Sequence, residues 1–160
     1  MVAYVLHAEG ATVALTPYIM ARTAHHFFTM SHGYDTGKEI PFARHYLYCA
    51  SIEIGLKAAI LANECSEARK KFIKSLGHDL TKACGSFQQF YGSDLWSADD
   101  IEAVTAINPF FANKGLEYFT IDVLVDTVNG SAELPDIGRI EQAAKKVNAF
   151  VLERQFFKKL

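Results

Sequence analysis

The sequence predicts an all-α protein, an antiparallel helical bundle of five or six helices in a single domain that spans residues 1–160. Two observations carry this prediction. Apolar residues recur with a helical period through most of the chain, and several periodic segments begin with residues that cap a helix N-terminus. Half of the residues are hydrophobic and 21% are charged, which excludes a disordered chain because there is enough apolar surface to form a core.

The first half of the chain contains two predicted helices. Residues 2–6 fit either a short strand or the start of a helix. Thr16 and Pro17 mark the start of the first clear helix, since threonine caps well and proline is favoured at the first helical position. A loop is expected over residues 32–37. The second helix is expected from Pro41 to about residue 62, and it is apolar on nearly every face, which is typical of a central, buried helix.

Two shorter helices follow in the middle of the chain. The first covers residues 66–76 and is strongly charged, with Gly77 as its expected C-cap. The second opens at residues 78–79, where an aspartate can accept backbone N–H bonds, and it ends before residues 92–93.

The last third of the chain contains two more helices and one uncertain segment. Ser97 starts a helix that is expected to end at Pro109, and Pro135 starts the final helix. Between them, one short extended segment is expected near residues 117–125, although a short helical turn fits the stretch from residue 121 as well. The alternating apolar residues that favour a strand are Phe119, Ile121, Val123 and Val125.

Composition restricts the cellular setting. The net charge is −2, so the chain as a whole has no polyanion-binding character. No apolar run reaches the roughly 20 residues of a membrane span, and no basic segment opens a signal peptide. The cysteines, Cys49, Cys65 and Cys84, form no C-x-x-C pair. They are therefore expected to be reduced thiols in a cytoplasmic protein, with no disulfide framework, cofactor or zinc site.

The histidines leave one alternative open. His25 and His32 are seven residues apart and could share a helix face, and His45 or His78 could complete a three-histidine metal site. Neither H-x-x-x-H nor E-x-x-H occurs, so the spacing does not match a known ligand motif. A histidine-metal helical bundle is therefore kept only as an alternative to surface or hydrogen-bonded histidines.

One constellation is more informative. Glu53 and Lys57 are the only charges between residues 46 and 62, and their i, i+4 spacing favours an ion pair. Buried charges must find partners, so the pair has a structural role if it is buried. His78 and Asp79 then stand at the start of a later helix. These four residues are either part of the scaffold or part of a ligand site.

The segments 50–61 and 77–80 together resemble the HEPN (higher eukaryotes and prokaryotes nucleotide-binding) family. Its members typically show an apolar helix with an A-x-x-E-x-x-L-K-A-x-L-like core, followed by H-D-L at the start of the next helix. The resemblance implies a compact, often dimeric helical bundle. Many members are metal-independent ribonucleases that carry, in a late helix, an Arg and a His separated by four to six intervening residues. Here the last histidine is His78, and that spacing does not occur in the chain.

The resemblance therefore implies a non-catalytic binding or partner module. Such a module would bind a nucleotide or RNA, or pair with a nucleotidyltransferase or a toxin–antitoxin component encoded nearby, and Glu53, Lys57, His78 and Asp79 are its candidate residues. The first alternative is an atypical ribonuclease or toxin that uses His25, His26 or His78 with Arg22 or Arg44.

A homodimer is also expected. The chain has 12 Phe, 7 Tyr and 1 Trp. Phe110 and Phe111 are adjacent at a helix end, where both are not expected to reach the same core, and Phe156 and Phe157 raise the same problem. Exposed aromatic residues of this kind mark an association surface.

Overall fold

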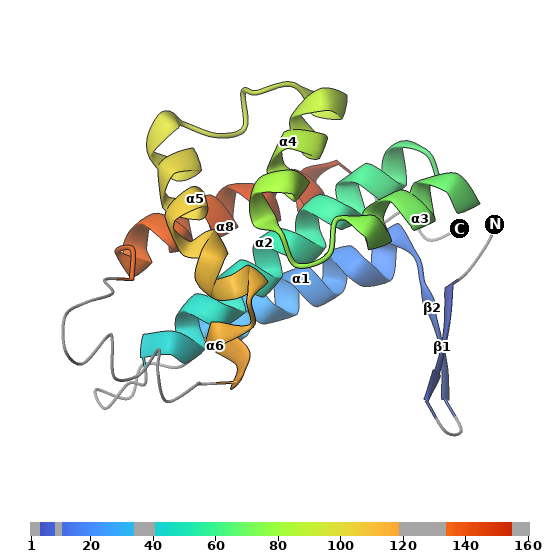
Figure 1. The fold of residues 1–160 in the computed structure, drawn as a ribbon. Coiled ribbons are helices and arrows are strands. Elements are labelled where there is room, and N and C mark those ends of the chain that lie inside the picture. Colours follow the sequence, from blue (N-terminus) through green and yellow to red (C-terminus); the bar gives the residue numbers. More distant parts are fainter. Residues whose placement is uncertain (1–3, 9–10, 34–40, 119–133, 155–160) are drawn as a thin grey trace.

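The computed structural model describes residues 4–8, 11–33, 41–118 and 134–154, and it confirms the all-α helical bundle. An N-terminal β-hairpin precedes the helices (Figure 1). The elements in chain order are β1 (Tyr4–Ala8), β2 (Ala11–Leu15), α1 (Pro17–His32), α2 (Pro41–Asn63), α3 (Glu67–Ser75), α4 (Leu80–Tyr91), α5 (Ala98–Ala112), α6 (Gly115–Tyr118) and α8 (Ile137–Glu153).

The hairpin settles the ambiguity at the N-terminus in favour of a strand. β1 and β2 pair antiparallel, with Tyr4 opposite Leu15 and Ala8 opposite Ala11. In Figure 1 the hairpin extends away from the helices and leads directly into α1. The all-α prediction did not include this element.

Helix α2 is the centre of the bundle, as its apolar sequence predicted. It packs against α1, α3, α4, α6 and α8. Its inward side chains, including those of Tyr48, Ile52, Leu56 and Leu61, are fully buried. Because helices surround it on several sides, a polar group on α2 has little water nearby and depends on partners from neighbouring elements. Among the described helices, none combines the length and the apolarity that a membrane crossing requires.

The predicted helix starts are confirmed by their caps. The Thr16 hydroxyl accepts a hydrogen bond from the backbone N–H of Ile19, and α1 begins at the following proline. Ser97 and Asp100 form a reciprocal capping box at the start of α5. Asp79 caps α4, as the sequence predicted, and Ser66 and Asp136 cap α3 and α8.

Two predicted boundaries were wrong. Helix α5 does not end at Pro109 but continues to Ala112. A proline inside a helix costs about 3 kcal/mol, but the extra turn buries Phe111 and leads to the buried Leu116, each of which contributes about 1.5–3 kcal/mol. The extended segment does not begin at residue 117, because Glu117 and Tyr118 belong to helix α6. The rest of that segment, from residue 119, lies outside the described residues.

Gly55 lets α2 approach its neighbours closely. A Cβ atom added there would lie 2.6 Å from Cγ1 of Val147 on α8 and 3.6 Å from Cβ of Ala24 on α1. Val147 is buried and β-branched, so it has little freedom to move aside. The glycine is therefore a packing requirement of the three-helix contact.

We predict opposite effects for two glycine substitutions. Gly55→Ala should lower the free energy of unfolding by about 1–3 kcal/mol, because it overpacks the core. Gly85→Ala is the matched control, since it lies in helix α4 with nothing within 4 Å of the added Cβ, and it should raise that free energy by about 0.5–1 kcal/mol. Urea melts measure both, and stabilisation by Gly55→Ala would contradict this packing.

Candidate functional site

The structure brings three of the four motif residues together around Glu53. This carboxylate lies in the middle of α2 and is buried. Lys57 Nζ donates to its Oε1 at 2.5 Å, and His78 Nδ1 lies 3.1 Å from its Oε2. We call Glu53, Lys57 and His78 the Glu53 cluster. It joins one turn of α2 to the segment that precedes α4.

Lys57 also holds the chain between α3 and α4. Its Nζ donates to the backbone carbonyl of Gly77 at 2.5 Å. Gly77 has a φ of 58°, in the left-handed region that glycine adopts without strain. The side chains of Glu53 and Lys57 are only 8% and 13% exposed. Each charged group therefore takes the place of water around the other. The bond from Lys57 to Gly77 also fixes the α3–α4 connection against α2.

Asp79 has a different, structural role. It caps α4 by accepting from the backbone N–H of Lys82, and it accepts from the hydroxyl of Thr81 and from Nδ2 of Asn108. Oδ1 of Asn108 in turn accepts from the N–H of Leu80. Partial burial of Asp79 acts to raise its pKa, but the hydrogen bonds from Thr81 and Lys82 outweigh this and lower the pKa to about 2. Asp79 therefore joins α4 to α5 as an ionised cap.

The Glu53 cluster opens onto a cavity of about 160 Å³. Residues from α1, α2, α5, the α3–α4 connection and the α5–α6 connection form its walls. Pockets for drug-sized ligands measure roughly 300–1,000 Å³, so this cavity is suited to a smaller group. The residues that line it are Phe27, Tyr46, Ala50, Glu53, Ile54, His78, Phe111 and Lys114.

The polar groups of the cavity lie at different depths. Glu53 is buried, whereas the side chain of His78 is 52% exposed. A carboxylate only accepts, so His78 must donate its Nδ1 proton to Glu53, which leaves Nε2 for solvent or a ligand. The His78 ring stands edge-on to Phe111, with centroids 6.1 Å apart, and Tyr46 lies 6.0 Å from the same ring. The cavity thus combines a fixed carboxylate, an oriented imidazole and aromatic walls.

Lys114 was not predicted to be a site residue. It follows α5, and its φ of 60° makes it the one described non-glycine residue with a left-handed backbone. Such a conformation costs roughly 1–2 kcal/mol for a residue with a Cβ atom. The sequence offered only a weak signal, because Gly115 follows one position later. The aromatic walls were also missed, since Phe27, Tyr46 and Phe111 come from three helices whose packing the sequence does not reveal.

The alternative set of Arg22, His25, His26 and Arg44 does not form one site. Arg22 is exposed and contacts the hydroxyl of Tyr18 near the start of α1. Arg44 lies beside the other end of α1, because Glu141 contacts both Arg44 and His32. The ten residues from Arg22 to His32 span about 15 Å of helix. His26 is exposed on α1, and His25 is half-buried there with no partner for its Nδ1.

The histidines proposed for a metal site also have separate partners. Nε2 of His32 lies 3.3 Å from Glu141, and Nε2 of His45 lies 2.9 Å from the carbonyl of Pro135. His78 belongs to the Glu53 cluster. Within residues 11–33, 41–118 and 134–154, no group of three or more His, Cys, Asp or Glu side chains is arranged to hold a metal ion.

Two of the three cysteines lie inside the helical bundle. All three are free, and Cys49 and Cys84 are buried. Burial, followed by the nearby charge of Glu53, raises the pKa of the Cys49 thiol well above its usual range. Burial, followed by the charge of Asp79, raises the pKa of Cys84 to about 12. Both thiols are therefore protonated and pack as small apolar groups.

No protein-family model, curated protein or solved structure matches the chain with significance. The resemblance to HEPN domains therefore rests on the residues of the two motif segments.

We predict strong coupling between Glu53 and Lys57. Glu53→Gln and Lys57→Met should each lower the free energy of unfolding by about 3 kcal/mol, because each leaves a buried charge without its main partner. The double mutant should lose less than the sum of the two single losses. Denaturant melts of the full cycle test this expectation.

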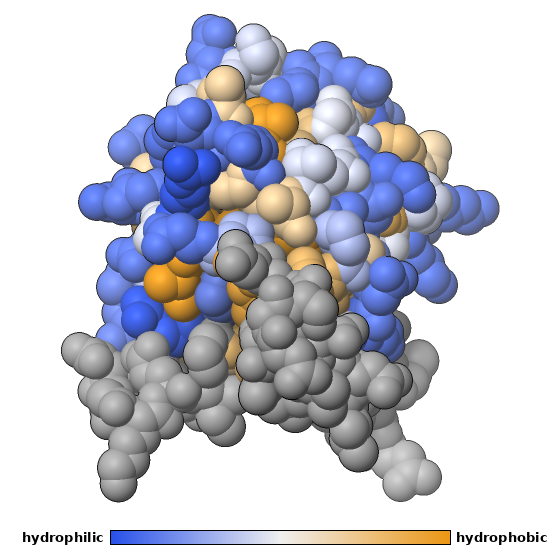
Figure 2. Space-filling model, turned by 60° about the vertical axis from the view of Figure 1, so that its left-hand side comes forward, coloured by the Kyte–Doolittle hydropathy of each residue, from blue (hydrophilic) through white to orange (hydrophobic). Residues whose placement is uncertain are grey.

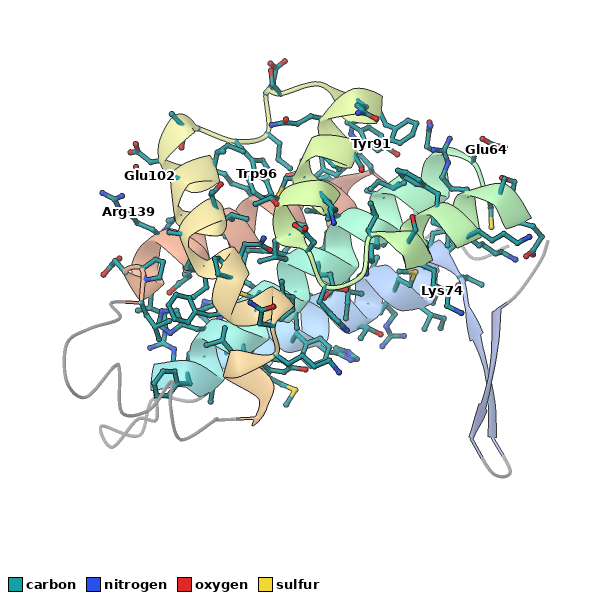
Figure 3. The ribbon with its side chains drawn as sticks, in the orientation of Figure 1. Glu64, Lys74, Tyr91, Trp96, Glu102 and Arg139 are labelled. Atoms are coloured by element: carbon teal, nitrogen blue, oxygen red, sulfur yellow. The ribbon has the colours of Figure 1, made fainter. Side chains whose placement is uncertain are left out.

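The matched control for this cycle is the exposed pair Glu102–Arg139, which joins α5 to α8 at the surface (Figure 3). Its atoms lie 3.8 Å apart, and both side chains are more than half exposed, so the same cycle should give less than about 1 kcal/mol. Additive losses at Glu53 and Lys57 would show that the two charges act independently.

Proposed function

We propose that this protein is a non-catalytic, HEPN-like helical module that binds a nucleotide or RNA, with the cavity at the Glu53 cluster as its binding site. One observation carries the proposal. Two segments that resemble HEPN motifs meet at Glu53 and His78, and both residues line a cavity with aromatic walls. Planar bases stack on aromatic side chains, which makes such walls suitable for a nucleobase.

The local charge supports an anionic ligand. Although the whole chain has a net charge of −2, the cavity lies beside Lys57, His78 and Lys114, and Glu53 is the one acid among the described residues that line it. Lys57 pairs with Glu53, and the side chains of Lys114 and His78 lie at the same cavity, where a cationic lysine and an imidazole N–H can both contact an anion. A ligand with an aromatic part and a phosphate matches this distribution.

The assembly of the protein is part of the same proposal. We propose a cytoplasmic protein that pairs with itself, or with a nucleotidyltransferase or toxin–antitoxin component encoded nearby. Fewer exposed aromatic side chains now support a homodimer. Phe111 is buried and Phe110 is half-buried, while Phe156 and Phe157 lie outside the described residues. On the face drawn in Figure 2, the described apolar residues show as small patches among hydrophilic ones.

A second candidate function is an atypical ribonuclease. The observation that favours it is the hydrogen bond from His78 to a buried carboxylate, because such a bond orients an imidazole for proton transfer. Lys114 at the same cavity would face the phosphate. Incubation of RNA with the pure protein in EDTA separates the two functions. We expect intact RNA, and cleavage that disappears in His78→Ala would establish the second function instead.

We predict that Lys114→Gly separates binding from stability. The substitution relieves the left-handed backbone, so the free energy of unfolding should rise by about 1 kcal/mol. Affinity for a labelled single-stranded RNA should nevertheless fall about tenfold, because one charge-assisted hydrogen bond to phosphate is lost. Fluorescence anisotropy measures the affinity.

The control for this experiment is Lys74→Ala, an exposed lysine on α3 (Figure 3), which should leave the affinity unchanged. Equal losses for the two variants would show that RNA is held by general surface charge. The absence of binding by the wild-type protein to any RNA or nucleotide would overturn the proposed function.

A further inference from the structure

The chemistry of the cavity restricts which base it can take. Glu53 is held by two donors, Lys57 on Oε1 and His78 on Oε2, so its orientation is fixed before a ligand arrives. An ionised carboxylate has about four acceptor sites and no donor, so two donors leave it with further capacity. Because Lys57 pairs with it, Glu53 is suited to accept from the N–H donors of an uncharged ring that enters the cavity.

The aromatic lining favours a flat ligand. Phe27, Tyr46 and Phe111 contribute three aromatic rings, and Ala50 and Ile54 add apolar surface. A planar ring can pack against such side chains while its polar edge reaches Glu53. The small volume admits a base but not a whole nucleotide, so the sugar and phosphate would stay at the rim, where His78 and Lys114 are exposed.

The four common bases differ sharply against a carboxylate. Guanine presents two adjacent donors, N1–H and the 2-amino group, which match the two oxygens of a carboxylate. Adenine and cytosine each place a ring-nitrogen acceptor beside their single amino group, and uracil flanks its N3–H with two carbonyl oxygens. In a partly desolvated site, these acceptor atoms would be repelled by the carboxylate oxygens of Glu53. Each acceptor left without a hydrogen bond would lower the binding affinity.

We infer that the cavity is selective for guanine, bound through its Watson–Crick edge to Glu53, with the attached phosphate directed to Lys114 and His78. This inference rests on the proposed function, because it names the base that the nucleotide- or RNA-binding site prefers. It also assigns Glu53 two tasks, one in holding the α3–α4 connection and one in recognising the ligand.

The test is a titration of the full chain with GMP, IMP, AMP, CMP and UMP by isothermal calorimetry. We expect GMP to bind at least about tenfold more tightly than AMP, CMP and UMP, the discrimination that one good bidentate contact provides. IMP keeps N1–H but lacks the 2-amino group, so its affinity should fall between GMP and AMP. This comparison uses only the wild-type protein and does not depend on the folding of any variant.

Two variants sharpen the experiment. Glu53→Gln should remove the preference for GMP over AMP, because the amide presents one donor and one acceptor. Glu102→Gln, an exposed acid on α5, is the matched control and should keep the preference. A thermal melt of each variant confirms that it is folded at the temperature of the titration.

The outcomes distinguish the two proposals. Equal affinity for all five nucleotides would overturn guanine selectivity and leave the proposed function standing. A preference for GMP that persists in folded Glu53→Gln would also overturn the inference, because another group would then read the base. If no nucleotide and no single-stranded RNA binds, the proposed function fails, and the inference fails with it.

Discussion

The need to compensate one buried carboxylate organises this protein. Glu53 lies in the helix that every other described helix except α5 contacts extensively, and its side chain is 8% exposed. An ionised group at this position without partners would lose several kcal/mol of solvation. Lys57 is supplied by the next turn of the same helix, whereas His78 is supplied by a segment 25 residues away in the chain. The fold must therefore bring the start of α4 to the middle of α2.

This requirement explains why the α3–α4 connection is well defined. Lys57 bonds both to Glu53 and to the carbonyl of Gly77, and the next residue, His78, returns to Glu53. Asp79 then caps α4 and reaches Asn108 on α5. Three consecutive residues thus connect α2, α4 and α5 through polar contacts. The same connection forms one wall of the cavity, so the scaffold and the candidate site share their contacts.

The sequence predicted what depends on neighbouring residues. Helix starts were read from Thr16, Asp79 and Ser97, because a cap bonds to the backbone two or three positions later. The pairing of Glu53 with Lys57 followed from helical spacing. The hydrogen bond between His78 and Glu53, however, depends on how α4 approaches α2. The motif indicated only that both residues matter.

Features that depend on long-range packing were missed. Pro109 marks a helix end by local rules, but the burial of Phe111 extends α5 beyond it. The cavity required knowing that Phe27, Tyr46 and Phe111 meet, and they come from three helices. Lys114 was missed for a different reason. A left-handed backbone favours glycine or asparagine, so local preference argues against a lysine at that position.

The strained backbone at Lys114 and the burial of Glu53 are both typical of a functional site. Both features reduce stability locally, and both residues line the same cavity. A chain selected only for stability would favour glycine at position 114 and an apolar side chain at position 53, because a well-packed hydrophobic residue often replaces a buried ion pair at no cost. Residues that break local rules at one place are typical of functional sites. A ligand that reaches Glu53 must also share it with His78, so binding there would act directly on the contact that holds the α3–α4 connection to α2.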